Sequence, residues 1–360
     1  MRKEGSLMRK MQEFIVQGKR IFIGLEDSKK TWRLCVRSEG MVVHTTSMPT
    51  LYEALRAYLL ERYPDCTVTV MYEAGFQGFW LHDLLEKDGI RCVVTPPNKV
   101  SGPKDERVKT DRRDAYRLAL NLESGDYVPC CVPDKERRED RQISRTLSQI
   151  QKDIRVEKNR IRRFLDFHGL NGGLQGGAWT DKDYLRLKDK ELPHSLKVSL
   201  SAYLRVLETL FATEKELESE LKALCEKERY TMSVRIKRSV PGVGWLSAIR
   251  FTLEWGNLNR FPTGKHFAAF TGLTCREYST GETIRRGRIT GQSSEYVRSW
   301  LIECAWRAIR IAPALLTKFM RVWHNSGSKK KAIVAVARKI AVRIRAIELS
   351  GQLYCPSVVE

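Results

Sequence analysis

The chain has 360 residues, 42% of them hydrophobic and 9% aromatic, enough for two or three folded domains with a substantial core. Its 64 Lys and Arg against 43 Asp and Glu give a formal charge of +21, which favours a polyanionic partner over a basic surface that serves only solubility. Nine cysteines without a CxxC pair argue against disulfides and structural zinc, and the lack of any apolar stretch of roughly 18 residues argues against a membrane protein.

The N-terminal third alternates short apolar runs with helical patterns, after a polar leader over residues 1–18. The patterns predict strands over 21–25, 32–37 and 41–46, a helix over 51–63, a strand over 67–72, a helix over 76–88, a strand over 91–95 and a helix from about residue 110. A meander of three strands extended by parallel strands is typical of an RNase H-like (RuvC-like) α/β domain. We place this domain at residues 19–133.

The middle of the chain, residues 134–235, has apolar residues at heptad spacing. The first series is Ile143, Leu147, Ile150, Ile154, Ile161 and Leu165, and the second is Leu196, Leu200, Tyr203, Leu207, Leu210, Leu217, Leu221 and Leu224. Glu157 and Glu214 interrupt them, and a Gly-rich excursion over 168–180 separates them. The spacing predicts an α-helical coiled coil, either an antiparallel hairpin that projects as an arm or an arm that pairs with another subunit. An ordinary helical bundle within one globule is the alternative.

The C-terminal part, residues 236–350, reads as mostly α-helical, followed by a tail over 351–360. Helical patterns cover 295–311 and a basic segment over 329–349. Near its start, Gly242 and Gly244 resemble the turn of a helix-hairpin-helix motif, in which backbone amides approach a phosphate.

Carboxylates from three separate segments stand where a predicted strand ends or a predicted helix begins. Glu26 ends the first strand, Glu73 ends the fourth, and Asp111 and Asp114 lie at i and i+3 of one helix. In an RNase H-like fold these segments meet, and carboxylate oxygens are the ligands that Mg²⁺ prefers. We therefore predict a site for one or two Mg²⁺ ions that acts on phosphodiesters. Taken singly, each carboxylate could instead be a helix N-cap or a solvated surface charge.

Four segments, read together, carry a resemblance to a known family: 72–75 (YEAG), 109–115 (KTDRRDA), 272–281 (GLTCREYSTG) and 286–290 (RGRIT). In this combination almost the whole chain resembles the transposases of insertion sequence 110 and its 1111 subgroup. The resemblance implies a bacterial, cytoplasmic DNA recombinase with a RuvC-like domain, a coiled-coil middle and a C-terminal transposase domain. It also implies a structured bridge RNA that pairs with donor and target DNA.

The family uses a quartet of carboxylates (DEDD) together with a serine, and the matching positions here are Glu26, Glu73, Asp111 and Asp114. The first position is usually Asp, so the neighbouring Asp27 is the second choice for that ligand. The resemblance implies that Ser279 attacks the DNA and forms a covalent phosphoserine, with Thr280 as the second choice. Without the resemblance, a serine before Thr-Gly is more simply a turn residue.

Cations are concentrated in three places that we predict to bind nucleic-acid phosphates. They are Arg112 and Arg113 beside the carboxylates; Arg137, Arg138, Arg141, Arg145, Arg160, Arg162 and Arg163 along the first heptad helix; and Arg276, Arg285, Arg286, Arg288, Lys329, Lys330 and Lys331 in the C-terminal part. Acidic residues are interspersed in the first heptad helix, so a solvated helix face explains its cations equally well.

The predicted function is an RNA-guided DNA recombinase that assembles as a homo-oligomer, dimer to tetramer, with composite sites from different subunits. Two alternatives remain at this point. One is a RuvC-like nuclease that cuts branched DNA with the carboxylates alone, and the other is a nucleic-acid-binding protein without catalysis.

Overall fold

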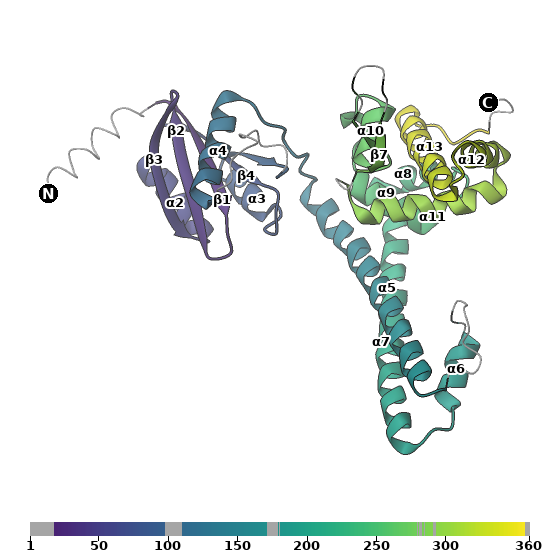
Figure 1. Cartoon of the computed structure of the whole chain (residues 1–360). Coiled ribbons are helices and arrows are strands. Elements are labelled where there is room, and N and C mark those ends of the chain that lie inside the picture. Colours follow the sequence, from purple (N-terminus) through teal and green to yellow (C-terminus); the bar gives the residue numbers. More distant parts are fainter. Residues whose placement is uncertain are drawn as a thin grey trace. The chain divides into compact units, whose positions relative to one another are not determined.

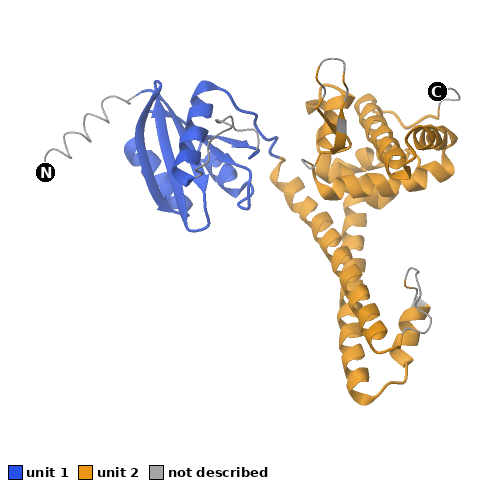
Figure 2. Ribbon diagram, viewed as in Figure 1, with its two compact units in different colours: residues 1–132 blue, residues 133–360 orange. Residues whose placement is uncertain are grey.

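The computed structural model describes residues 18–97, 110–170, 179, 181–278, 280, 283, 285–290 and 293–356. The chain divides into two compact units, residues 1–132 and residues 133–360, which Figure 2 shows in different colours. Each unit is described by itself. In the part of the chain that the structure describes, no helix has the length and apolar character needed to cross a membrane.

Unit 1 is built on a mixed five-stranded sheet with strand order β3-β2-β1-β4-β5 (Figure 1). The strands are β1 (Arg20–Asp27), β2 (Thr31–Ser38), β3 (Met41–Pro49), β4 (Thr67–Glu73) and β5 (Arg91–Thr95). The first three form an antiparallel meander, and β4 and β5 extend it in parallel from β1. This mixed sheet and the order of its elements agree with the α/β domain predicted from the sequence.

Helices cover both faces of this sheet. Helices α2 (Tyr52–Arg62) and α3 (Trp80–Lys87) bury Leu55, Leu59, Leu81 and Leu85 against one face, together with every second residue of the central strands. Helix α4 (Asp111–Ser124) packs Leu118 and Leu122 against Met71 and Val93 on the other face. Successive side chains along a strand point to opposite faces of the sheet. In β1 the odd-numbered residues face α2 and α3, and the even-numbered residues face α4.

Gly24 allows α4 to lie directly on β1. A Cβ atom at this position would come within 2.1 Å of the Ala115 carbonyl oxygen and 2.4 Å of the Ala119 amide nitrogen. Only glycine permits such an approach of two backbones. The first turn of α4, which carries Asp111 and Asp114, is therefore held against the end of β1 by backbone packing.

Unit 2 begins with two helices of 33 residues each, α5 (Lys135–Phe167) and α7 (His194–Glu226), which run side by side in Figure 1. They are antiparallel, since Ile154 shares a core with Leu207, and Leu147 shares one with Leu221 and Leu224. The short helix α6 (Asp181–Asp189) lies between them in sequence, and its Leu187 joins the same core as Ile154. The predicted heptad residues thus supply the contacts between these helices.

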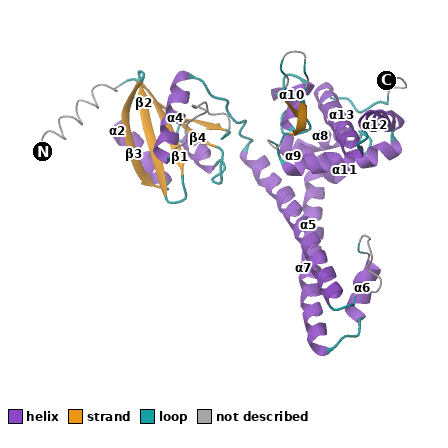
Figure 3. Cartoon of the chain, in the orientation of Figure 1, coloured by secondary structure: helices purple, strands orange, loops and turns teal. Residues whose placement is uncertain are grey.

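The remainder of unit 2 is mostly helical, as the colours of Figure 3 show. Its helices surround one large core. Its elements are α8 (Glu228–Arg238), α9 (Trp245–Trp255), the 3-10 turn η1 (Leu258–Arg260), α10 (Gly264–Phe270), the short strands β6 (Cys275–Glu277) and β7 (Arg286–Ile289), α11 (Glu295–Ile311), α12 (Pro313–Ser326) and α13 (Lys329–Ser350). Helix α9 is buried on nearly all sides and forms the centre of this cluster. Helices α8 and α12 were not predicted.

Candidate functional site

Glu26 and Glu73 end two adjacent parallel strands on the face that α4 covers. Leu25 pairs with Tyr72 in the β1–β4 register, so Glu26 and Glu73 follow at neighbouring positions. Glu26 points to the same face of the sheet as Gly24, two residues earlier, which touches α4. Glu73 likewise points to the same face as Met71, which packs on Leu118. Both side chains are half-buried. The ends of β1 and β4 therefore place two carboxylates side by side beneath the start of α4.

The first turn of α4 supplies the other two predicted carboxylates. Thr110 is the N-cap residue, and its Oγ1 accepts a hydrogen bond from the Arg113 amide at 3.4 Å, so Asp111 is not needed as a cap. Asp114 lies on the buried face of the helix, only 7% exposed, and Arg117 Nη1 is 3.4 Å from its Oδ1. Asp111 lies one turn earlier and is exposed. A buried carboxylate beside two others needs a positive charge nearby to offset its desolvation.

These four side chains fit a divalent cation by the chemistry of their donors, which are all carboxylate oxygens. Within the described residues, however, no three acidic, His or Cys side chains are close enough to hold one ion. The structure thus brings the carboxylates to one end of the sheet without closing them into a metal site.

Asp27 faces the opposite layer from Glu26. Its Oδ1 accepts a hydrogen bond from Trp32 Nε1 at 3.2 Å and another from Gln77 Nε2, and Trp32 belongs to the core beneath α2 and α3. Burial raises the pKa of Asp27 to about 6, although the Trp32 hydrogen bond opposes the shift. Asp27 thereby ties the turn after Glu73 to the end of β1 from the other face. Glu26 is the residue that shares the α4 face with Glu73.

The predicted serine comes between β6 and β7 in the sequence of unit 2. Ser279 and the side chain of Arg286 fall outside the described part of the structure. The second choice, Thr280, forms an isolated bridge with Thr283 through two backbone hydrogen bonds of 3.2 and 3.1 Å. Tyr278 precedes this bridge, and its amide donates to the Arg285 carbonyl oxygen at 2.8 Å. The described residues thus place Thr280 near the tip of a hairpin whose strands carry Arg276, Arg285 and Arg288.

Several cations predicted to bind phosphates have structural partners. Arg145 forms a two-pronged ion pair with Glu254 of α9, at 2.7 and 3.0 Å, and Arg141 Nη1 is 3.8 Å from the same carboxylate. Arg137 pairs with Asp134 at 3.7 Å, and Arg160 pairs with the buried Glu157. Arg162 lies over the Trp179 ring, 5.9 Å from its centroid, and Arg138 also has a partner in the structure. These ion pairs give the cations of α5 a role in stabilising the fold. A role of the same cations in phosphate binding stays a prediction.

The two glycines of the predicted helix-hairpin-helix turn differ. Gly242 has φ +86°, and a Cβ there would meet the Cys304 carbonyl oxygen at 2.4 Å, so contact between this turn and α11 accounts for the glycine. Gly244 is exposed, has nothing within 4 Å of a Cβ, and is the N-cap of α9. Of the two positions, Gly244 is the one at which a phosphate has access.

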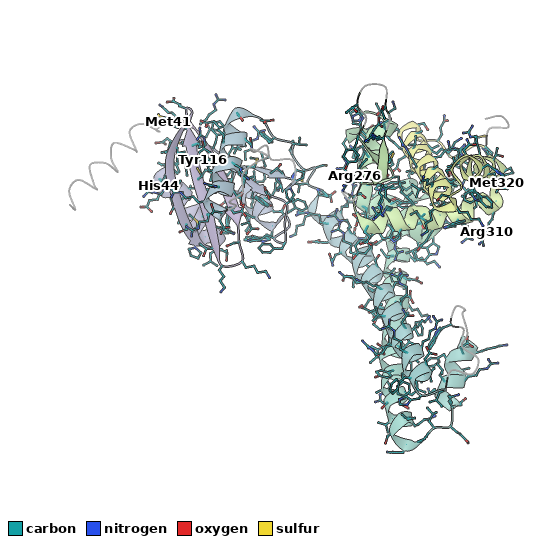
Figure 4. All side chains as sticks on the ribbon, viewed as in Figure 1. Met41, His44, Tyr116, Arg276, Arg310 and Met320 are labelled. Atoms are coloured by element: carbon teal, nitrogen blue, oxygen red, sulfur yellow. The ribbon has the colours of Figure 1, made fainter. Side chains whose placement is uncertain are left out.

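A second set of predicted cations is exposed: Arg112, Arg113, Arg163, Arg276, Arg285, Arg288, Lys329, Lys330 and Lys331. The three lysines occupy the first turn of α13, where the helix dipole disfavours positive charge. They cost helix stability there, and Lys329 Nζ lies 4.5 Å from the centroid of the Trp323 ring. Sequence reasoning missed Lys318 and Arg321 on α12, the helix on which Figure 4 labels Met320. Burial, followed by the nearby charges of Arg321, Lys339 and Arg338, lowers the pKa of Lys318, so these cations form one cluster.

Comparisons with known proteins agree with this geometry. Residues 23–169 match the model of the DEDD-type transposase of IS110, described as "Transposase", and residues 235–320 match the model described as "Transposase IS116/IS110/IS902 family". A Sinorhizobium fredii protein named as a candidate transposase, y4qE, is 28% identical over 78% of this chain and 69% of its own length. The "Transposase for insertion sequence element IS1111A" of Coxiella burnetii is 24% identical over 98% of both chains. The IS1533 transposase of Leptospira borgpetersenii is 24% identical over 76% of this chain and 79% of its own.

An α/β unit with carboxylates at its strand ends, followed by a basic helical unit, and matched on both by transposase models, defines a DNA transposase. The chain belongs to the IS110/IS116/IS902 family of transposases, and it is an enzyme of an insertion sequence. The family resemblance found in the sequence is thereby confirmed.

Proposed function

We propose that this transposase cleaves DNA with the carboxylates of unit 1, in an RNase H-like domain whose ligands are Glu26, Glu73, Asp111 and Asp114. One observation carries the proposal: Glu26 and Glu73 end adjacent strands on the face covered by α4, the helix that holds Asp114 buried. Carboxylates gathered at one end of a sheet, one of them buried, are candidates for a functional site.

A divalent cation, Mg²⁺ in our proposal, would supply Lewis-acid activation and neutralise charge on the phosphate. The four carboxylates would hold it, and Gly24 keeps α4 close enough for Asp111 and Asp114 to contribute. Arg112 and Arg113, exposed on the same turn, would contact phosphates near the cleaved bond. Asp27 accepts a hydrogen bond from Gln77 and so holds the turn that follows Glu73.

The second part of the proposal is the nucleophile. Ser279 would attack the phosphorus atom, forming a bond between its Oγ and phosphorus while the bond to a DNA sugar oxygen breaks and that oxygen takes a proton. The bond energy kept in the phosphoserine would then allow rejoining without ATP. Its support is the family and the basic hairpin that leads to Thr280. The DEDD domain alone favours carboxylate catalysis, so the serine is tested separately.

Guidance by a structured RNA, and assembly into a homo-oligomer through a coiled coil of α5 and α7, complete the proposal. An RNA guide would use exposed cations that read duplex shape and backbone. The long antiparallel pair of α5 and α7 supports an arm that reaches another subunit, because Val198 and Val206 are about half exposed on its outer surface. Sequencing of RNA that copurifies with the protein would test the guide directly.

The carboxylates are tested with Glu73→Gln and Asp114→Asn in an excision assay on a plasmid that carries the insertion sequence. Each should lower excision by at least about 100-fold, since loss even of groups that only support metal ligands costs roughly 10–100-fold. Chemical denaturation of both variants separates loss of activity from loss of folding, since Asp114→Asn also removes the ion pair with Arg117. Glu53→Gln, an exposed carboxylate on α2, is the matched control. Normal excision by Asp114→Asn would refute the proposal.

The serine is tested in the same assay with Ser279→Ala and Thr280→Ala. A recombinase that uses Ser279 should lose strand exchange and the covalent protein–DNA product with the first variant and keep both with the second. If Ser279→Ala keeps cleavage and exchange, the carboxylates act alone and the chain is a nuclease of the RuvC type.

A further inference from the structure

The β6–β7 ribbon carries a tyrosine that the proposed reaction does not use. Tyr278 follows β6 and remains paired with the opposite strand through its amide. Its side chain is 62% exposed. Across the ribbon stands Gly287, where an added Cβ would lie 3.5 Å from Tyr278 Cε2 and 3.6 Å from Arg276 Cβ. Tyr278 and Arg276 therefore project from the same face of the ribbon, over a residue that has no side chain of its own.

Folding gives no account of this exposed ring. Within the described residues, Tyr278 forms no ring contact with another aromatic or a cation, and its hydroxyl makes no hydrogen bond. It also belongs to none of the apolar cores of unit 2. Exposing a tyrosine at this level forfeits the free energy that burial of an aromatic side chain supplies. Phe76 and Phe167 are exposed to a similar or greater extent, so exposure leaves the ring accessible to a partner, and the surrounding charges have to indicate which one.

The charges around the ring identify the chemistry of that partner. Arg276, Arg285 and Arg288 are exposed on the ribbon, and none of the three pairs with a carboxylate among the described residues. Figure 4 labels Arg276 on this ribbon. An open aromatic face among unpaired guanidinium groups is the combination by which proteins bind unpaired nucleic-acid strands, with bases stacked on the ring and phosphates held by the cations. A duplex offers no such base, because each base face is covered by its neighbours.

We propose that Tyr278 is a stacking platform for an unpaired base of single-stranded DNA, with Arg276 and Arg285 holding the adjacent phosphates. DNA is the ligand because the chain is a DNA transposase. Stacking itself does not depend on the proposed reaction. That the stacked base adjoins the cleaved bond does rest on the proposed function, because Tyr278 directly precedes Ser279. On this view Tyr278 positions the strand and takes no part in bond making or breaking.

The test measures binding by the full-length protein in EDTA, so that no cleavage occurs and failure of the carboxylate proposal would leave the result intact. The probes are single strands of about 12 nucleotides, within the roughly 4–16 nucleotides typical of such sites, containing 2-aminopurine, together with the duplex and the RNA of the same sequence. Tyr278→Ala should weaken single-stranded DNA binding about tenfold, as expected for one lost base–aromatic stack. Duplex binding should change less than about twofold, since electrostatic contacts to the backbone remain.

Tyr278→Phe keeps the ring and is the matched control, and Tyr278→Leu keeps apolar bulk without it. Quenching of 2-aminopurine should persist with Phe and disappear with Leu and Ala. Unfolding of the three variants should match the original protein, because the side chain is exposed. Three results would each overturn the proposal: unchanged binding by Tyr278→Ala, an equal loss for single strand and duplex, or a Tyr278-dependent signal with RNA but not with DNA.

Discussion

The acidic residues of unit 1 and the basic residues of unit 2 are positioned in opposite ways. Glu26, Glu73 and Asp114 are half-buried or buried at the ends of packed strands and a packed helix. The cations of the ribbon and of the first turn of α13 are exposed, while Arg145 and Lys237 are paired inside unit 2. Groups that hold a small ion need a rigid scaffold, whereas groups that bind a long polyanion need access to it. The predictions below test whether this contrast holds.

The largest effect is expected from Gly24→Ala. A Cβ within 2.1 Å of the Ala115 carbonyl oxygen cannot be relieved by any rotamer, so α4 must move away from β1. The free energy of unfolding should fall by about 3 kcal/mol, the upper range for overpacking. Excision should be lost with it, because Asp111 and Asp114 move as well.

The control is Gly75→Ala, where the nearest atom to an added Cβ is 3.8 Å away. Chemical denaturation should find this variant as stable as the original protein. If Gly24→Ala retained both stability and excision, the positioning of α4 by backbone contact would be refuted.

The exposed side of the contrast is tested by replacing Lys329, Lys330 and Lys331 together with Ala. DNA binding should weaken, and the slope of log affinity against log salt should decrease by about 2–3, since each phosphate contact contributes roughly 0.9. Stability should rise by about 1 kcal/mol, because each of the three charges recovers about 0.3–1 kcal/mol at a helix N-terminus and loss of the Lys329 contact with Trp323 offsets part of this gain. Lys215→Ala, on the exposed surface of α7, should leave the slope unchanged. A lower stability without a change in slope would assign the lysines to folding.

The paired cations of α5 are tested by Glu254→Gln. Glu254 is 5% exposed at its side chain and Arg145 is 38% exposed, so the loss should be smaller than the roughly 3–5 kcal/mol of a fully buried pair. We expect about 2 kcal/mol by chemical denaturation. A double-mutant cycle with Arg145→Met should show coupling, while each variant keeps the salt slope of DNA binding. If Arg145→Met instead reduced the slope of log DNA affinity against log salt, Arg145 would contact a DNA phosphate.

Much of unit 1 was predictable from its sequence because its elements are local patterns. Alternating apolar residues and strand-ending carboxylates gave both the order of the elements and the predicted positions of Glu26 and Glu73 at strand ends. The helix predicted from residue 76 instead begins at Trp80, since Gly78 takes a positive φ of 62° that ends the preceding turn. What the sequence could not reveal is the approach of α4 to Gly24, which depends on residues about 90 positions apart.

Unit 2 was harder to predict because some of its cations form ion pairs within the fold whereas others remain exposed. Arg145 and Arg276 look alike in the sequence, yet Arg145 finds Glu254, 109 positions away, and Arg276 stays exposed. Helices α8 and α12 lack the long heptad series that marks α5 and α7. Tyr278 had no signal of its own, because only the structure distinguishes an exposed aromatic residue from a core one. Partner choice over long distances, which sequence periodicity does not encode, decides these cases.

The smallest effect concerns the buried Lys237, whose Nζ pairs with Glu348 of α13 and lies 2.6 Å from Ser233 Oγ. Burial lowers the pKa of Lys237 from 10.5 to about 8, although Glu348 opposes the shift. Between these two values the unfolded chain binds more protons than the folded one, so stability should rise with pH. We expect a gain on the order of 1 kcal/mol between about pH 7.5 and 9.5, measured by chemical denaturation. Lys237→Met, which fills the same space without a charge, should lose this gain relative to the original protein. An equal gain in both would show that Lys237 keeps its proton throughout, held by Glu348.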